Sequence, residues 1–117
     1  MTITLKFGKD ELKCSLGLMF LGEFLDDVDM SLEEVGDKMT KNPFRLLPKM
    51  IHISARTEAE IKGDDFDLTL KDVVDLIEKD GGIASPQVTK FINTWTKSLT
   101  NGVPESSAEE GEGEKKK

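Results

Sequence analysis

The sequence predicts a mainly α protein, a small helical domain of about five helices with an N-terminal two-stranded β-hairpin and a disordered acidic C-terminal tail. Clean alternation of apolar and polar residues is confined to residues 2–15, as in strands that are buried on one face. From there to residue 99, apolar residues recur at helical spacing. The rest is almost entirely polar or glycine. We therefore expect a helical domain over residues 1–99 and a charged tail over residues 100–117.

Composition argues against several classes of partner. The chain has 117 residues and a formal net charge of −7, so it lacks the concentrated basic surface that binds nucleic acid or an anionic membrane. No run approaches the ~18 consecutive apolar residues of a membrane span, and the N-terminus has no signal-peptide pattern. These features predict a soluble intracellular protein. The single cysteine, Cys14, offers no intrachain disulfide and fits a reducing compartment.

The hairpin is predicted from two alternating segments, residues 2–7 and 11–15, joined by a turn at residues 8–10. Cys14 lies on the apolar face of the second segment, which favours a buried thiol over a reactive one. Because two strands alone are marginally stable in water, this face should pack on helices. Each outer edge of the hairpin is either covered by local structure or free to pair with another chain.

Residues 16–25 form a densely apolar stretch and predict a buried helix of about three turns. Gly22 weakens such a helix, which is usually accepted where close packing needs a small residue. The stretch holds more apolar residues than one core-facing side of a helix needs, so part of it is a candidate partner-binding surface. The candidate contacts in this helix are Leu18, Met19, Phe20, Phe24 and Leu25.

Two acidic segments, residues 26–39 and 64–77, repeat the same pattern. In each, a hydroxyl residue is followed three positions later by an acid, as in Ser31 with Glu34 and Thr69 with Asp72. This is the spacing of a capping box, and the preceding aspartates favour the positive end of a helix dipole. Both segments are therefore predicted helix N-termini, and repeated use of capping rules is favoured over a duplicated unit.

A central helix is predicted over residues 42–61, because its first half is apolar on more than one face. One stripe consists of Phe44, Leu47, Ile51 and Ala55. Asn42 followed by Pro43 suits a helix start, and Gly63 suits its end. Its apolar half should lie between the hairpin and the last helix.

Two residues of this central segment stand out. Pro48 is awkward inside a helix, so either the helix kinks there or residues 43–47 form a separate first turn. His52 is the only histidine of the chain, and no second ligand or catalytic partner accompanies it in the sequence. We interpret His52 as structural or solvated.

Two more helices follow. The first is predicted over residues 70–80 and ends at Gly81-Gly82. The second begins at Ser85-Pro86, because serine is a good cap and proline is tolerated in the first turn. Its apolar stripe should close the core, and a minority interpretation makes Phe91 and Trp95 partner contacts.

No residue set indicates catalysis, a cofactor or a metal site. A calcium-binding EF-hand loop is excluded because Leu32 and Lys38 stand where that loop needs glycine and a bidentate carboxylate. The sequence has no glycine-rich phosphate loop and no acid pair in an apolar setting. We therefore expect a protein that is not an enzyme.

The order of these segments resembles that of the tail assembly chaperones of long-tailed (siphovirus-type) bacteriophages. The resemblance covers about residues 2–99 and rests on the order of the elements and on the distribution of apolar residues along them. Its parts are a hairpin ITLKFGKDELKCSL, an apolar helix LGLMFLGEFL, a central segment NPFRLLPKMIHISA, a capped helix LTLKDVVDLIEK, a closing helix and a charged tail.

This resemblance implies a non-enzymatic protein of the infected host bacterial cytoplasm. Such chaperones associate with the tape measure protein, keep its long helical chain soluble, help tail tube subunits polymerise around it, and are absent from the finished virion. Many of their genes also give a longer product by programmed ribosomal frameshifting. The codons of residues 113–117 would suit this, since lysine codons are runs of adenine.

The net charge of −7 supports an alternative from another class. This is a small acidic adaptor or anti-repressor that offers a negative surface to a basic partner. Self-association through residues 16–25 or through a hairpin edge also stays open.

Overall fold

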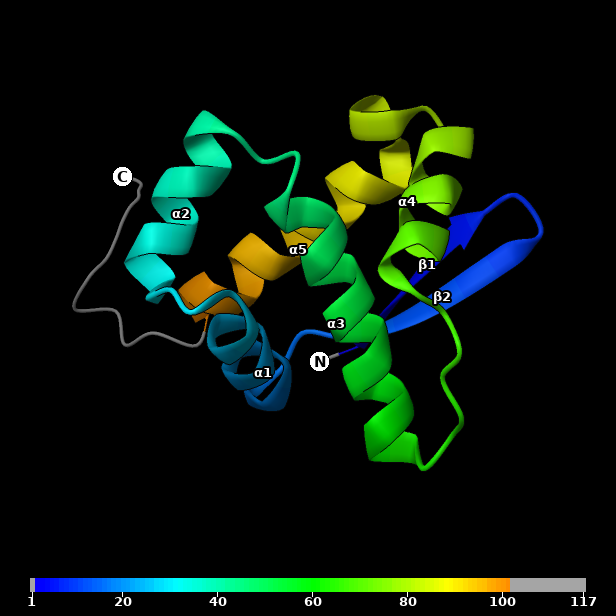
Figure 1. Ribbon diagram of the computed structural model, residues 1–117, viewed down its shortest axis with the longest axis horizontal. Coiled ribbons are helices and arrows are strands. Elements are labelled where there is room, and N and C mark those ends of the chain that lie inside the picture. The colour runs from blue at the N-terminus through cyan, green and yellow to red at the C-terminus, as the bar shows by residue number, and fades with distance from the viewer. Residues whose placement is uncertain (1, 102–117) are drawn as a thin grey trace.

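The structure, a computed structural model, describes residues 2–101 and places five α-helices around an N-terminal β-hairpin (Figure 1). Its elements are β1 Thr2–Phe7, β2 Asp10–Ser15, α1 Leu18–Val28, α2 Leu32–Lys41, α3 Leu46–Lys62, α4 Leu70–Lys79, the 3-10 helix η1 Gly82–Ala84 and α5 Pro86–Asn101. The predicted mainly α fold with an N-terminal hairpin is confirmed. Most of the predicted disordered tail, residues 102–117, lies outside the described residues.

The hairpin closes through a two-residue turn. Phe7 pairs with Asp10, so β2 begins one residue earlier than the sequence pattern suggested. Gly8 occupies the first turn position with φ 65°, a left-handed conformation that glycine adopts without steric penalty. Leu5 pairs with Leu12, and both side chains are buried. The apolar face of the hairpin therefore packs into the core, as predicted.

Helix α3 is the centre of the domain. Its backbone lies against β2, α1, α4 and α2, whereas the backbone of α5 comes closest to β1 and η1. The contact between α3 and the hairpin is confirmed, and α5 completes the core mainly from the β1 side. The buried apolar residues of α3 are Leu46, Leu47, Met50, Ile51, Ile53 and Ala55. Their spread around the helix explains why this segment needs neighbours on several sides.

Of the two alternatives for Pro48, a kinked helix or a separate first turn, the start of α3 favours a separate turn, although this turn is shorter than residues 43–47. Residues 43–45 form a turn, the N–H of Leu47 donates to the carbonyl of Pro43 at 2.9 Å, and α3 begins at Leu46. Pro48 is then the third helical residue, where a backbone N–H has no partner within the helix anyway. Phe44 precedes the helix and is 64% exposed, so its predicted place in the apolar stripe was wrong.

The far end of α3 is closed as predicted. Gly63 adopts φ 75°, and its N–H donates to the carbonyl of Glu60 at 3.2 Å. The N–H of Asp64 donates to the carbonyl of Ala59 at 2.8 Å. These are the two hydrogen bonds of a Schellman motif, which satisfies carbonyls that the helix leaves free.

Helix α1 is displaced from its predicted range. Leu16 is buried ahead of the helix, and α1 runs on to Val28, through Asp26 and Asp27. The prediction that these aspartates lie at the positive end of a helix dipole was therefore wrong, because they occupy the last turn of α1, at its negative end. Asp29 ends the helix with φ 54°, the one described non-glycine residue with positive φ.

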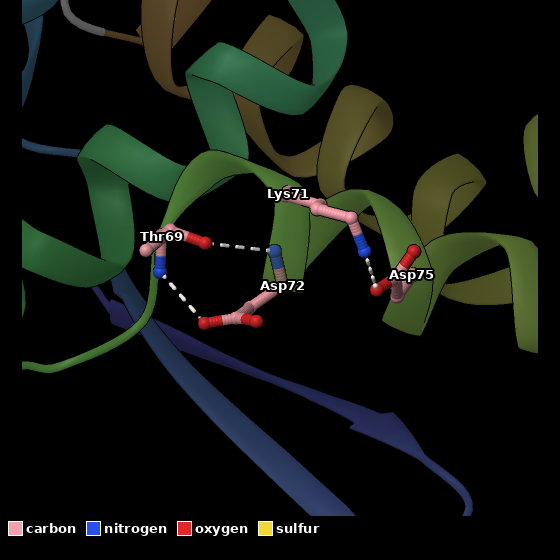
Figure 2. Close-up of polar contacts among 4 residues, drawn as sticks. All are labelled: Thr69, Lys71, Asp72 and Asp75. Atoms are coloured by element: carbon pink, nitrogen blue, oxygen red, sulfur yellow. Dashed lines mark hydrogen bonds and ion pairs between the residues drawn. The ribbon is translucent and has the colours of Figure 1, made fainter.

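Both predicted capping boxes are present. Ser31 Oγ accepts from the N–H of Glu34 at 3.1 Å, and Glu34 Oε1 accepts from the N–H of Ser31 at 2.8 Å. Figure 2 shows the second box, in which Thr69 Oγ1 and the Asp72 carboxylate accept from each other's N–H groups at 3.1 and 2.9 Å. The hydrogen bond from the Thr69 backbone holds the pKa of Asp72 below its usual value. The first segment begins in the last turn of α1, whereas the second begins in the loop after α3. The two segments therefore share their capping boxes without repeating one structural unit.

Removing either capping hydroxyl should destabilise the protein measurably. We expect Ser31→Ala and Thr69→Ala each to lower the free energy of unfolding by about 1 kcal/mol, because a free helix N–H loses its acceptor. Urea denaturation monitored by Trp95 fluorescence measures this loss. Thr40→Ala on α2 is the control, since its hydroxyl donates only to the Gly36 carbonyl within the helix. Equal effects of all three substitutions would contradict the capping role.

Candidate functional site

The predicted partner contacts fall into two groups. Phe20, Phe24 and Phe91 are completely buried, Trp95 is 7% exposed and Leu25 is half-buried. By contrast, Leu18 is 86% exposed and Met19 is 47% exposed. The folded domain therefore leaves the consecutive residues Leu18 and Met19 exposed at the start of α1, as a small apolar surface, and it places the aromatic residues in the core.

Helical periodicity explains this division of α1. Phe20 and Phe24 are four residues apart, face the core and stack with ring centroids 5.8 Å apart. Leu18, Gly22 and Asp26 have the same spacing on another face, and all three are exposed. A Cβ at Gly22 would meet no atom within 4 Å, so the expectation that this glycine allows close packing inside the domain was wrong.

Ion pairing fixes α1 on α3 beside this surface. Glu23 Oε1 lies 3.4 Å from Arg56 Nη2 and accepts a hydrogen bond from Thr57 Oγ1 at 3.3 Å. A hydrogen bond with Glu23 raises the pKa of the Glu60 carboxyl, since a shared proton relieves repulsion between the two acids. The exposed start of α1 thus belongs to a helix that is held in a defined position.

His52 has a structural role in this fold. Its Nε2 lies 2.9 Å from the carbonyl oxygen of Leu68, and its ring centroid lies 5.5 Å from that of Phe66. Both partners belong to the segment between α3 and α4. His52 therefore ties that segment to α3, in agreement with the structural interpretation.

Cys14 is a core thiol. It is completely buried, and burial is the main cause that raises the pKa of the thiol to about 11. Because the thiolate is the reactive species, this environment disfavours nucleophilic chemistry. The buried interpretation of Cys14 is confirmed.

Two further kinds of feature, a metal site and a membrane-spanning helix, are not found among residues 2–101. Within them, no group of three or more His, Cys, Asp or Glu side chains is placed to hold a metal ion. No helix in this part of the chain is both long and apolar enough to cross a membrane.

Sequence reasoning missed several exposed apolar side chains. Besides Leu18 and Met19, the large exposed ones are Leu32, Phe44 and Ile61. Phe44 lies four residues before Pro48, which has no N–H to donate to its carbonyl, and that spacing could have signalled that the regular helix begins after Phe44. Such singly exposed side chains are common on protein surfaces.

Comparisons of the chain with protein-family models, with curated proteins and with solved structures find no match.

Proposed function

We propose that this protein is a tail assembly chaperone of a long-tailed bacteriophage. It binds the tape measure protein in the host bacterial cytoplasm, keeps it soluble, assists tail tube polymerisation and leaves before the virion is complete. The element order on which the resemblance rests supports this proposal. The observation that carries it is the adjacent exposure of Leu18 and Met19 on α1.

This surface suits a helical partner. Leucine and methionine are adaptable apolar side chains, and methionine in particular tolerates partners of different shape. An amphipathic segment of the tape measure protein could lay its apolar stripe across them. Gly22 lies four residues after Leu18 and is exposed in open space, so a partner helix can approach the backbone of α1 closely there.

The charge of the chain supports the solubilising role. A net charge of −7 repels other copies of the complex and so opposes aggregation while the apolar surface is occupied. On this proposal, partner binding is driven by apolar contact, and the charge acts on solubility. The chaperone carries out no reaction.

Co-expression with the product of the neighbouring long helical gene tests the proposal. We expect the intact protein to increase the soluble fraction of that partner and to co-purify with it. The double variant Leu18→Glu/Met19→Glu should lose at least tenfold in affinity, because charges would be buried against an apolar stripe. Phe44→Glu is the matched control, since it changes another exposed apolar residue and should bind normally.

Three outcomes would contradict this proposal. The first is that the intact protein neither solubilises nor co-purifies with the partner. The second is that the double variant binds like the unchanged protein, which would remove the α1 surface as the contact. The third is that binding is abolished by salt and by deletion of residues 100–117, which would favour the acidic adaptor.

The longer frameshifted product is a separate part of the proposal. The coding sequence across Glu114–Lys117 tests it directly. A slippery heptamer with an overlapping downstream frame is expected, and the absence of either would remove this part alone.

A further inference from the structure

The two outer edges of the hairpin are treated differently by the rest of the protein. In a hairpin with a two-residue turn, the residues that flank the turn, Phe7 and Asp10, form hydrogen bonds with each other. Bonded and non-bonded pairs then alternate along the strands, and the residues of each non-bonded pair point their N–H and C=O groups outward. On β1 the outward residues include Thr4 and Lys6. On β2 they include Glu11 and Lys13.

Two of the outward groups of β1 are occupied by side chains of α5. The N–H of Lys6 donates to Gln87 Oε1 at 2.9 Å, and Lys90 Nζ donates to the carbonyl of Thr4 at 2.8 Å. Local structure thus covers this edge, one of the two fates expected for it. No further strand can pair with β1 unless these side chains move.

The outward groups of β2 are open. Among residues 2–101, no side chain or backbone group makes a hydrogen bond to the main chain of Glu11 or Lys13 outside the pairing with β1. An edge of this kind is a template for an added strand. Figure 1 shows the hairpin projecting at one end of the molecule, with α4 beside it.

A groove follows this open edge. Three adjoining hollows of about 370, 410 and 330 Å³ follow one another. The first lies between β2 and the end of α3 with the loop after it, the second lies between β2 and α4, and the third lies between the hairpin turn and the end of α4. Leu12 and Leu68 line both the first and the second hollow, while Leu76 lines both the second and the third. The groove therefore runs from the hairpin turn along residues 10–13 of β2, which span roughly 14 Å. It has the length that a short extended peptide needs.

The groove is strongly acidic. Its lining includes nine aspartate or glutamate residues and four lysines. Glu58 lies in it with the residue only 5% exposed, and its Oε2 has no hydrogen-bond partner among the described residues. Lys62 Nζ, at 3.4 Å, is an ion-pair contact to that oxygen without hydrogen-bond geometry. A basic side chain that entered the groove could donate a hydrogen bond to Glu58 Oε2, which accepts none from the described residues.

We propose that the outer edge of β2 binds an extended, lysine- or arginine-rich peptide segment of another protein as a third strand. The main chain of the peptide pairs with Glu11 and Lys13, and alternate basic side chains reach the acidic lining. A second copy of this chain is a poor occupant, because two grooves with the same excess of acids would face each other. This surface is independent of Leu18 and Met19, so the two proposals can fail separately.

A synthetic peptide of alternating lysine and valine, eight residues long, tests the proposal on the full chain. We expect it to bind and to slow hydrogen exchange at the N–H groups of Glu11 and Lys13 at least tenfold. A matched peptide with glutamate in place of lysine should not bind. The lysine peptide with N-methyl groups on alternate residues should also fail, because it keeps the charge and loses the donors.

Two variants locate the binding. Lys13→Pro removes an outward N–H that β1 does not use, so the fold should persist while peptide affinity falls at least tenfold. Asp65→Asn/Asp67→Asn, at two exposed groove positions, should weaken binding severalfold and lower its salt dependence. Leu18→Glu should bind the peptide normally.

Several results would overturn the proposal. They are equal binding of the N-methylated peptide, unchanged exchange at Glu11 and Lys13, and equal affinity for the glutamate peptide. A dimer in solution that Lys13→Pro dissociates would also overturn it, since the edge would then pair with a second copy.

Discussion

Replacing Phe24 with alanine is expected to lower the free energy of unfolding by about 3–5 kcal/mol. Phe24 is completely buried in α1 and stacks on Phe20, so truncation removes apolar contact and leaves a cavity in the core. Small domains have a total stability of roughly 5–15 kcal/mol, so the variant should lose a large share of it and unfold at a clearly lower urea concentration. Urea titration followed by the fluorescence of the buried Trp95 measures the change.

Leu18→Ala is the matched control for this prediction. It removes a large apolar side chain from the same helix, but that side chain is 86% exposed and leaves no cavity. We expect a change within about 0.5 kcal/mol. The pair of variants separates the core role of α1 from its surface role. A large loss for Leu18→Ala, or a small one for Phe24→Ala, would mean that α1 packs with a different face inward.

The sequence predicted best what local chemistry decides. Ser31 and Thr69 begin helices because a hydroxyl and an acid three residues later satisfy the same free N–H groups wherever they occur. Gly63 ends α3 because few other residues adopt φ 75° without steric penalty. The alternation of β1 and β2 likewise gave the correct buried face.

Other features depend on distant contacts and could not be predicted. An aspartate can cap the start of one helix or end another, so Asp26 and Asp27 were assigned to the wrong helix. Apolar excess in residues 16–25 marked a candidate surface, but only the orientation of α1 on α3 decides that Leu18 and Met19 are exposed. The difference between the two hairpin edges depends on the position of α5, whose Gln87 and Lys90 cover β1 and leave β2 open.

Alkylation of Cys14 by iodoacetamide should be slowed at least about 10³-fold in the folded protein relative to the protein in urea. The side chain is completely buried, and reaction therefore requires an opening of the fold. If that opening is global unfolding, the rate should rise in proportion to the loss of stability, and Phe24→Ala should accelerate it strongly. Leu18→Ala should leave it unchanged. Fast alkylation of the folded protein, or equal rates in both variants, would contradict this account.

The pH dependence of alkylation gives this prediction a second measurement. The pKa of the Cys14 thiol is about 11 in the folded protein, against an ordinary value of 9.0. A raised folded pKa stabilises the fold below pH 9, and this contribution is lost as pH rises from about 9 to about 11. In urea the rate should level off above about pH 9, where most of the free thiol is ionised. In the folded protein the alkylation rate should keep rising about tenfold per pH unit to about pH 11, because unfolding becomes more favourable over that window.

The chain contains no tyrosine, so no phenol titrates between pH 9 and pH 11. Levelling at pH 9 in both conditions would show that the folded environment does not raise the pKa of this thiol.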